Sequence, residues 1–559
     1  MCTTMIFTRS ACADGAMRVT HSDDNELSDQ RLIYVPAQDH PPGAERGVVD
    51  GSADPYPRLV SYARGPNYAL PGYPETPLIG LIPQVAHTWA YYDGSYGVMN
   101  EHNLMFGECT NGAKFQPNHV SQEEASREGK QCRLFYSAEL SRIALERCTR
   151  AREAVELMGS LIDEYGYFST GETLLVGDEN EAWVFEMCAL PDEKYHSAWA
   201  AQRVPDGEVF VAANEFRIRV LEKGNPDQLW SPLLEPGVEK IGWWKPADGP
   251  LDWLPTVSEG EYSHPYYSLR RVWRVFDRVN PDLALSPWVN GKGYTTDYPF
   301  SILPSRPLPR HDIFSLYRDH YEGTEFDLTQ GIAAGPYGDP NRFIGPYDGA
   351  QNNISSEVLY GAWERAISIF YQGYISVCEV RPTAPDLTKG VCWFGPDVAY
   401  TTCFTPFPAK MTDLPKSYQT GDPQVFSRDV AWWAFDFVAN WARLNYQRMC
   451  KVDIRPLQQQ LEAQGEAVLA TWDADAASGK LDVNGLTRLA AAEADNVVTQ
   501  WWQLADRLIA KYSDGYVNGT PEKPQNPAPV AVGYSSDWLG KTNYAQGPVS
   551  YAMHFRNNE

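Results

Sequence analysis

The chain has 559 residues, and its 47 basic and 72 acidic side chains give a formal net charge of −25 with histidine neutral. This acidic balance argues against nucleic acid or an anionic membrane surface as a partner, because both bind clustered Lys and Arg. The 43% hydrophobic and 21% charged content is that of a globular protein. No run of about 18 apolar residues occurs, so the sequence predicts no membrane-spanning helix.

Strand signals dominate the first half of the chain. A turn at Asp14-Gly15 separates two short predicted strands, and the polar, proline-bearing stretch 21–78 predicts a loop with little regular structure. Apolar residues at near-helical spacing predict one long helix over 137–164, which Gly166 ends. The strands that we expect in this half are 3–8, 17–20, 84–92, 97–108, 173–176, 182–187 and 208–213.

The second half begins with a region rich in Pro, Gly, Trp and Tyr. Residues 220–350 predict long ordered connections around one helix, 267–279. We expect a layered α/β catalytic domain with antiparallel sheets over 1–408, and a helical extension with a surface-wrapping tail over 409–559. The other expected elements are strands 367–371, 373–380 and 391–394 and helices 429–446, 456–472 and 486–508.

The ten cysteines and the N-terminus predict a cytoplasmic protein. No CxxC pair occurs, and a chain of this length has no need of disulfide bonds. The segment Met-Cys-Thr-Thr-Met-Ile-Phe-Thr-Arg lacks the charged start and long apolar run of a secretory signal. We therefore expect reduced, buried thiols, with one exception at the start of the chain.

Cys2 is that exception, because removal of Met1 would give it a free α-amine. An α-amine has an ordinary pKa of about 7.7–8.0 and a thiol one of about 8.5. One residue would then carry both a nucleophile and a base that accepts its proton at neutral pH. Such a pair attacks amide carbonyls without a histidine. The alternative is that a cysteine stands at this position by chance.

A series of motifs follows in order through most of the chain, and the longest block is Arg318 to Gly338. The other blocks are Cys2-Thr3-Thr4, His21-Ser22-Asp23-Asp24, Asn100-Glu101-His102, Gly107-Glu108-Cys109-Thr110, Ala213-Asn214-Glu215-Phe216-Arg217-Ile218, Tyr267-Ser268-Leu269-Arg270-Arg271-Val272-Trp273 and Trp432-Trp433-Ala434-Phe435. Together these motifs resemble the dipeptidase A-type cysteine peptidases of the N-terminal-nucleophile hydrolase superfamily.

The resemblance implies an α+β fold, a four-layer αββα sandwich, with Cys2 as nucleophile and its α-amine as base. It also implies an aspartate near that amine; spacing favours Asp24, with Asp23 as the alternative. Asn214 is expected to stabilise the oxyanion, with Thr110 as the second donor. An arginine near the nucleophile is expected at Arg270 or Arg271.

One departure from the pattern concerns His21. Related bile-salt hydrolases and penicillin acylases have an arginine before the aspartate, whereas histidine stands here. A neutral imidazole gives less cationic support to a thiolate than an arginine does. The sequence leaves two roles for His21, relay of a proton and orientation of its neighbours.

The predicted function is hydrolysis of dipeptides, with no metal or organic cofactor. The expected partner is a small peptide, with neither nucleic acid nor membrane, and the sequence leaves open whether the protein is a homo-oligomer. Rival hypotheses are an amidohydrolase of the same fold acting on a penicillin side chain or conjugated bile acid, and a silent binding protein. A metallopeptidase using His311 and His320 is disfavoured, because the two lack HExxH spacing.

Overall fold

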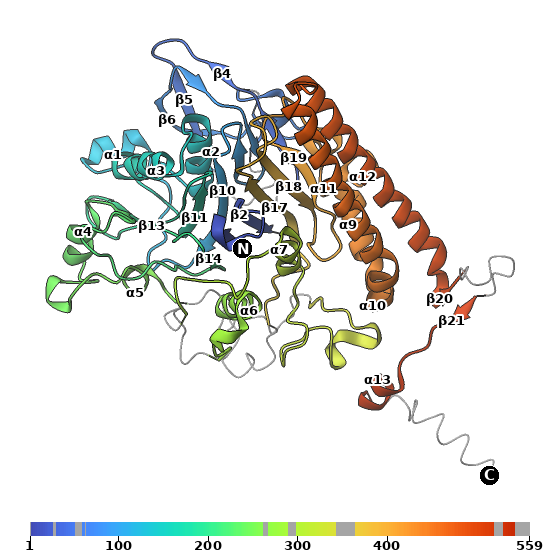
Figure 1. Ribbon diagram of the computed structural model, residues 1–559. Coiled ribbons are helices and arrows are strands. Elements are labelled where there is room, and N and C mark those ends of the chain that lie inside the picture. The colour runs from blue at the N-terminus through green and yellow to red at the C-terminus, as the bar shows by residue number, and fades with distance from the viewer. Residues whose placement is uncertain are drawn as a thin grey trace.

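The computed structural model describes residues 2–25, 29–50, 59–61, 63–260, 267–288, 298–342, 364–518 and 529–542. Helices and antiparallel strands are mixed along the chain, so the fold is α+β. Two large sheets lie at the centre, and the longest helices run along one side of them (Figure 1). Among the described helices, none combines the length and the apolar character needed to cross a membrane.

The first sheet has seven strands and contains the N-terminal strand near its middle. That strand, Thr3–Phe7, consists of β-branched and large apolar residues and is buried along its whole length. It pairs with a strand on either side, which fixes the position of the residue before it. In spatial order the strands are β16 (Ser301–Ile302), β14 (Val209–Ala212), β1 (Thr3–Phe7), β2 (Met17–Asp24), β17 (Gln372–Val380), β18 (Gly390–Pro396) and β19 (Thr405–Pro408).

The second sheet has eight strands and packs against the first. Gly107 marks the point of close approach: a Cβ there would collide with the Thr4 hydroxyl and lie 2.7 Å from the carbonyl oxygen of Thr20. In spatial order the strands are β15 (Gln228–Trp230), β13 (Ser197–Arg203), β12 (Ala182–Ala189), β11 (Gly171–Gly177), β10 (Met105–Asn111), β9 (Gly97–Asn100), β8 (Tyr91–Asp93) and β3 (Ile33–Val35).

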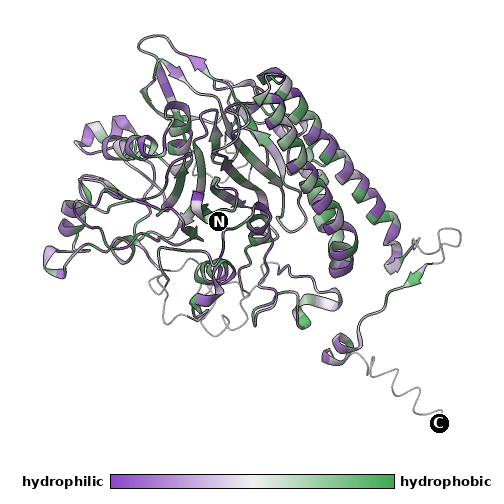
Figure 2. Ribbon diagram, in the orientation of Figure 1, coloured by the Kyte–Doolittle hydropathy of each residue, from purple (hydrophilic) through white to green (hydrophobic). Residues whose placement is uncertain are grey.

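Helices cover the outer faces of both sheets. Helices α2 (Ser137–Arg147) and α3 (Ala151–Tyr165) pack on the eight-stranded sheet, and α9 (Ala431–Ala442), α11 (Arg455–Ala477) and α12 (Val483–Lys511) pack on the seven-stranded sheet. The apolar residues concentrate on the strands, and the long helices alternate between apolar and polar faces (Figure 2). Helices thus lie against both of the large sheets.

Shorter elements complete the described chain. The small strands are β4 (Gln38–Asp39), β5 (Glu45–Val49), β6 (Leu78–Pro83), β7 (His87–Thr88), β20 (Tyr516–Val517) and β21 (Val530–Ala531). The remaining helices are α1 (Gln122–Glu128), α4 (Leu234–Lys240), α5 (Trp253–Val257), α6 (Leu269–Val279), α7 (Arg310–Tyr317), α8 (Lys416–Gln419), α10 (Tyr446–Met449) and α13 (Ser536–Lys541).

The predicted N-terminal strand pair, the β11–β12 hairpin, α6 and the long C-terminal helices are confirmed. The single helix over 137–164 is wrong, because the chain breaks between α2 and α3. Asn100 donates through its side chain to the carbonyl oxygens of Leu145 and Cys148, both at 2.9 Å, and Asp178 accepts from the backbone N–H of Ala151. Distant residues thus satisfy the two helix ends that the break creates.

Three other predictions were wrong in part. The stretch 21–78 contains β3 and β5, whose hydrogen bonds go to β8 and β6 further along the chain. Residues 367–371 precede β17 without forming a strand, and the region 220–350 holds α4, α5 and α7 as well as α6. Strands that pair with distant segments show little local periodicity in the sequence, and so do short helices. Local patterns therefore do not predict them. The division of the chain at residue 408 stays a prediction.

Candidate active site

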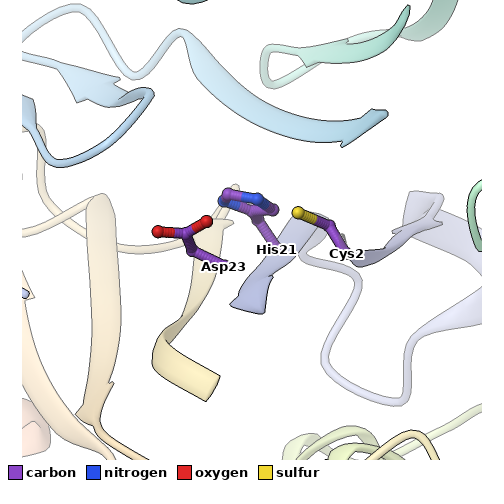
Figure 3. Close-up of side chains that lie close together, drawn as sticks. All are labelled: Cys2, His21 and Asp23. Atoms are coloured by element: carbon purple, nitrogen blue, oxygen red, sulfur yellow. The ribbon is translucent and has the colours of Figure 1, made fainter. Parts of the chain in front are cut away.

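The register between β1 and β2 brings the nucleophile candidate beside two polar side chains. Thr3 pairs with Ser22 and Thr4 with His21, so Cys2 and Thr4 share a face of the sheet with His21 and Asp23. The Cys2 sulfur, a ring nitrogen of His21 and a carboxylate oxygen of Asp23 lie within 4.8 Å of one another, and all three residues are buried. His21 lies between the other two (Figure 3).

A glutamate from the opposite sheet completes this cluster. The Cys2 thiol donates to Glu108 Oε2 at 3.0 Å, and His21 Nε2 lies 3.3 Å from the same oxygen. The hydroxyl of Thr110 donates to the other carboxylate oxygen at 3.0 Å. Gly107, the residue that lets β10 approach β1, immediately precedes this glutamate. Glu108 therefore reaches the thiol across the interface between the sheets.

Sequence reasoning quoted Glu108 within a motif but assigned it no role. The signal that could have found it is an acidic residue in the middle of a strand, Met105–Asn111, directly after the apolar start Met105-Phe106-Gly107. Charged side chains are almost never fully buried unless they are paired. A fully buried glutamate there predicts a partner across the core.

The charges around the thiol are strongly coupled. Burial raises the pKa of Cys2 well above its usual value, and the charge of Glu108 adds to this. Burial opposes ionisation of Glu108 too, but the hydrogen bond and charge of His21 hold its pKa well below the usual range. Burial and the Glu108 charge together raise the pKa of neighbouring Glu172. Burial and the neighbouring charges thus favour the neutral form of the Cys2 thiol, the charged form of Glu108 and the protonated form of Glu172.

Arg271 links Cys2, the residue before β1, to Asn214. Arg271, on α6, donates to the carbonyl oxygen of Cys2 and to Asn214 Oδ1, both at 2.8 Å. Asn214 Nδ2 donates to the carbonyl oxygen of Thr110 at 2.7 Å, and its backbone N–H points at the Cys109 sulfur, 2.8 Å away. Asn214 has a φ of 63°, a left-handed conformation that asparagine tolerates better than most residues. One buried arginine thus connects the expected nucleophile and the expected oxyanion donor.

Two other expected site residues, Asp24 and Arg270, form ion pairs with other side chains. Asp24 follows on the opposite face of β2, where its carboxylate accepts from Arg365 at 2.6 Å. Arg270 donates to Glu364 at 3.2 Å, and its guanidinium lies 3.5 Å from the centre of the Phe326 ring. Of the two adjacent arginines, Arg271 is therefore the one that contacts Cys2.

The histidines of the metallopeptidase hypothesis lie in separate surroundings. The side chain of His311 is 77% exposed, whereas His320 is buried and its ring contacts Glu322 at 3.1 Å. Within the described ranges, the one group of three Cys, His or acidic side chains close enough to share a metal ion is the cluster around the Cys2 thiol. Thiolate, imidazole and carboxylate are all zinc ligands, so that cluster has suitable donors.

Comparison with known proteins identifies relatives of the chain. The model of peptidase family C69 matches residues 120–459. A probable dipeptidase of Latilactobacillus sakei is 25% identical over 313 residues, 56% of this chain and 58% of the relative. A probable dipeptidase B of Lactococcus lactis subsp. lactis is 23% identical over 442 residues, 77% and 79% of the two chains.

A dipeptidase of Bifidobacterium longum is 24% identical over 299 residues, 52% of this chain and 50% of the relative. The chain thus spans about half the length of several curated relatives that it matches. The family match begins after the nucleophile strand, at residue 120. The roles of Cys2 and its neighbours consequently depend on the geometry described above.

Proposed function

Because the chain belongs to peptidase family C69, we propose that it is a cysteine dipeptidase with Cys2 as the nucleophile. The observation that carries this proposal is the buried Cys2 thiol, which donates to Glu108 of the opposite sheet beside His21 and near the Asn214–Arg271 pair. Similarity to proteins named dipeptidase supports the same reaction. The fold proposed for it is the four-layer αββα sandwich of N-terminal-nucleophile hydrolases.

The proposed reaction begins with loss of Met1, which gives Cys2 a free α-amine. The amine takes the thiol proton, and the sulfur attacks the carbonyl carbon of the peptide bond. Collapse of the tetrahedral intermediate breaks the carbon–nitrogen bond, and the proton on the amine passes to the departing amino acid. Water, deprotonated by the same amine, then attacks the acyl-enzyme. The carbon–sulfur bond breaks, the thiol regains its proton, and the N-terminal amino acid leaves.

The neighbours of Cys2 have proposed roles in this sequence. Asn214 stabilises the oxyanion, and its amide carries a second hydrogen beyond the one given to Thr110. Arg271 orients Cys2 through the carbonyl oxygen. Asp23, beside the thiol, is the better placed of the two aspartates to act on the nucleophile, since Asp24 pairs with Arg365.

A substrate panel tests the proposal and its rivals. Purified protein is incubated with unblocked dipeptides, a tripeptide, a penicillin and a conjugated bile acid, while intact mass reports whether Met1 is absent. We expect cleavage of dipeptides by protein that lacks Met1. Cleavage of the penicillin or bile acid alone would replace the dipeptidase by an amidohydrolase, and no cleavage with Met1 retained would favour a binding protein.

A further inference from the structure

The position of Glu108 bears on which end of a substrate the site recognises. In a dipeptide the amine nitrogen is separated from the scissile carbonyl carbon by one Cα, so the two atoms are about 2.5 Å apart. Attack requires the carbonyl carbon about 3–3.5 Å from the sulfur. The ammonium group of a reacting dipeptide is therefore held within about 6 Å of the Cys2 sulfur. A carboxylate that recognises it must lie in this zone, where Glu108 Oε2 is 3.0 Å from the sulfur.

We propose that Glu108 binds the α-ammonium group of the substrate's N-terminal residue and so restricts the enzyme to peptides with a free amino terminus. The inference rests on the proposed dipeptidase function and deepens it. Glu108 is a binding residue in this account, since it touches the substrate. Hydrogen bonds between an ammonium and a carboxylate are among the strongest that side chains make.

The two buried glutamates differ in the direction of their pKa shifts. The pKa of Glu108 is held well below its usual range and that of Glu172 is raised, so Glu108 is the carboxylate whose surroundings favour the charged form. An N-acylated peptide offers a neutral amide there, which brings no positive charge and fewer donors to the buried carboxylate, so it binds less tightly. A free ammonium group matches the carboxylate in both charge and hydrogen bonding.

Two further polar atoms face the same zone. Asp23 Oδ2 and Ser376 Oγ are buried and have no hydrogen-bond partner in the part of the chain that the structure describes. Ser376 pairs with His21 across β2 and β17, so it shares the face that carries the cluster. Buried polar atoms without partners are rare in folded proteins. An ammonium group has three donors, and these acceptors can take those that Glu108 does not.

Binding of the ammonium group also changes the thiol. It competes with the S–H group for Glu108 and offsets a negative charge that opposes thiolate formation. The substrate's own amino terminus would thereby help to release the nucleophile. The titratable and charged groups that surround the thiol are His21 and Asp23 on β2, Glu108 and Cys109 on β10, Glu172 on β11, Arg271 on α6 and Tyr374 on β17.

The experiment compares alanyl-alanine with N-acetyl-alanyl-alanine as substrates of the full-length protein. We expect wild type to prefer the free dipeptide by about 10–100-fold in kcat/KM, the effect of one buried charged hydrogen bond. Glu108→Gln should lose most of that preference, because the rate with the free dipeptide falls relative to the rate with the acetylated one. Glu108→Asp should keep the preference at a lower rate. Glu179→Gln, a change of the same kind in a hairpin turn away from the site, should behave as wild type.

A second measurement reports on the thiol without any substrate. Alkylation of Cys2 by iodoacetamide, followed by mass spectrometry of the N-terminal peptide, should be faster in Glu108→Gln than in wild type at the same pH. Three results would overturn the inference but leave the proposed function standing. They are a Glu108→Gln variant that still prefers the free dipeptide, an unchanged rate of Cys2 alkylation in that variant, and equal cleavage of both peptides by wild type. Wild-type cleavage of neither peptide overturns the proposed function and this inference with it.

Discussion

The thiol of Cys2 and the carboxylate of Glu108 lie 3.0 Å apart although 106 residues separate them in the chain. The contact crosses between the two sheets, where Gly107 allows the close approach. The proposed mechanism therefore requires release of the thiol from this hydrogen bond before it can attack a substrate. The predictions below concern the groups that hold and orient it.

Replacement of Arg271 should slow catalysis more than replacement of its neighbour. Arg271→Lys loses the two-pronged contact with the Cys2 carbonyl oxygen and Asn214 Oδ1, because a lysine ammonium lacks the planar fork of donors. Hydrogen bonds to charged groups contribute about 1.5–3 kcal/mol each, so we expect kcat/KM to fall about 10–100-fold. Arg270→Lys serves as the matched control, and a larger loss in that variant would reverse the assignment.

Asn214→Gly should lower kcat while the fold is retained. Glycine accepts the φ of 63° at this position without steric cost, so the substitution removes the amide and leaves the backbone conformation. Loss of one oxyanion donor typically reduces kcat about 10²–10³-fold. Steady-state kinetics should show this loss with a smaller change in KM. A variant with wild-type kcat would remove Asn214 from the oxyanion site.

The two adjacent aspartates should separate into one that acts on rate and one that acts on stability. Asp23→Asn removes the carboxylate proposed to hold the Cys2 α-amine in place, so we expect a lower kcat with little change in the melting temperature. Asp24→Asn leaves Arg365 buried without that carboxylate, and breaking a buried pair costs about 3–5 kcal/mol. Thermal melts and kinetics of both variants check this. The reverse pattern would return the catalytic role to Asp24, the residue that spacing favours.

Acid should destabilise the protein through Glu379. This buried carboxylate accepts from Arg18 and Arg310 at 2.7–3.0 Å; burial opposes its charge, but the two guanidinium groups hold its pKa well below the usual range. A glutamate in the unfolded chain has a pKa of about 4.3. Because the pKa of Glu379 in the folded protein is lower, its ion pairs stabilise the fold above about pH 4.3, and this stability is lost as the pH falls below that value. Urea unfolding midpoints should therefore decline below about pH 4.

Two variants identify the source of that decline. Glu379→Gln should have a lower midpoint at neutral pH and a flatter pH dependence below about pH 4, because the group that titrates is gone. Glu156→Gln, on the exposed face of α3, should follow wild type at each pH. Equal slopes in wild type and Glu379→Gln would assign the acid sensitivity to other carboxylates.

The strands and helices with strong local patterns could be predicted from the sequence. β1, β2 and α6 have the apolar spacing and turn residues that predict them, and their pairing follows from alternation. The break between α2 and α3 could not be predicted, because Asn100 and Asp178, far along the chain, stabilise it. Local patterns carry no information about which distant side chain will satisfy a helix end.

The candidate site, too, could be predicted from the sequence only in part. Cys2 could be singled out from its position, and Asn214 and the arginine pair from the resemblance. Which arginine and which aspartate lie beside the nucleophile depends on strand register and helix phase, which a one-residue shift reverses. Glu108 contacts the thiol only because β10 and β1 meet across the sheets, a relationship without a local signal.

The most direct test is hydrolysis of an unblocked dipeptide by wild type and by Cys2→Ala. Cys132→Ala, which removes a buried thiol on another part of the chain, is the matched control. We predict turnover by wild type and by Cys132→Ala, no turnover by Cys2→Ala, and at most a trace by Cys2→Ser. Undiminished hydrolysis by a folded Cys2→Ala variant would contradict the assignment of Cys2 as the nucleophile.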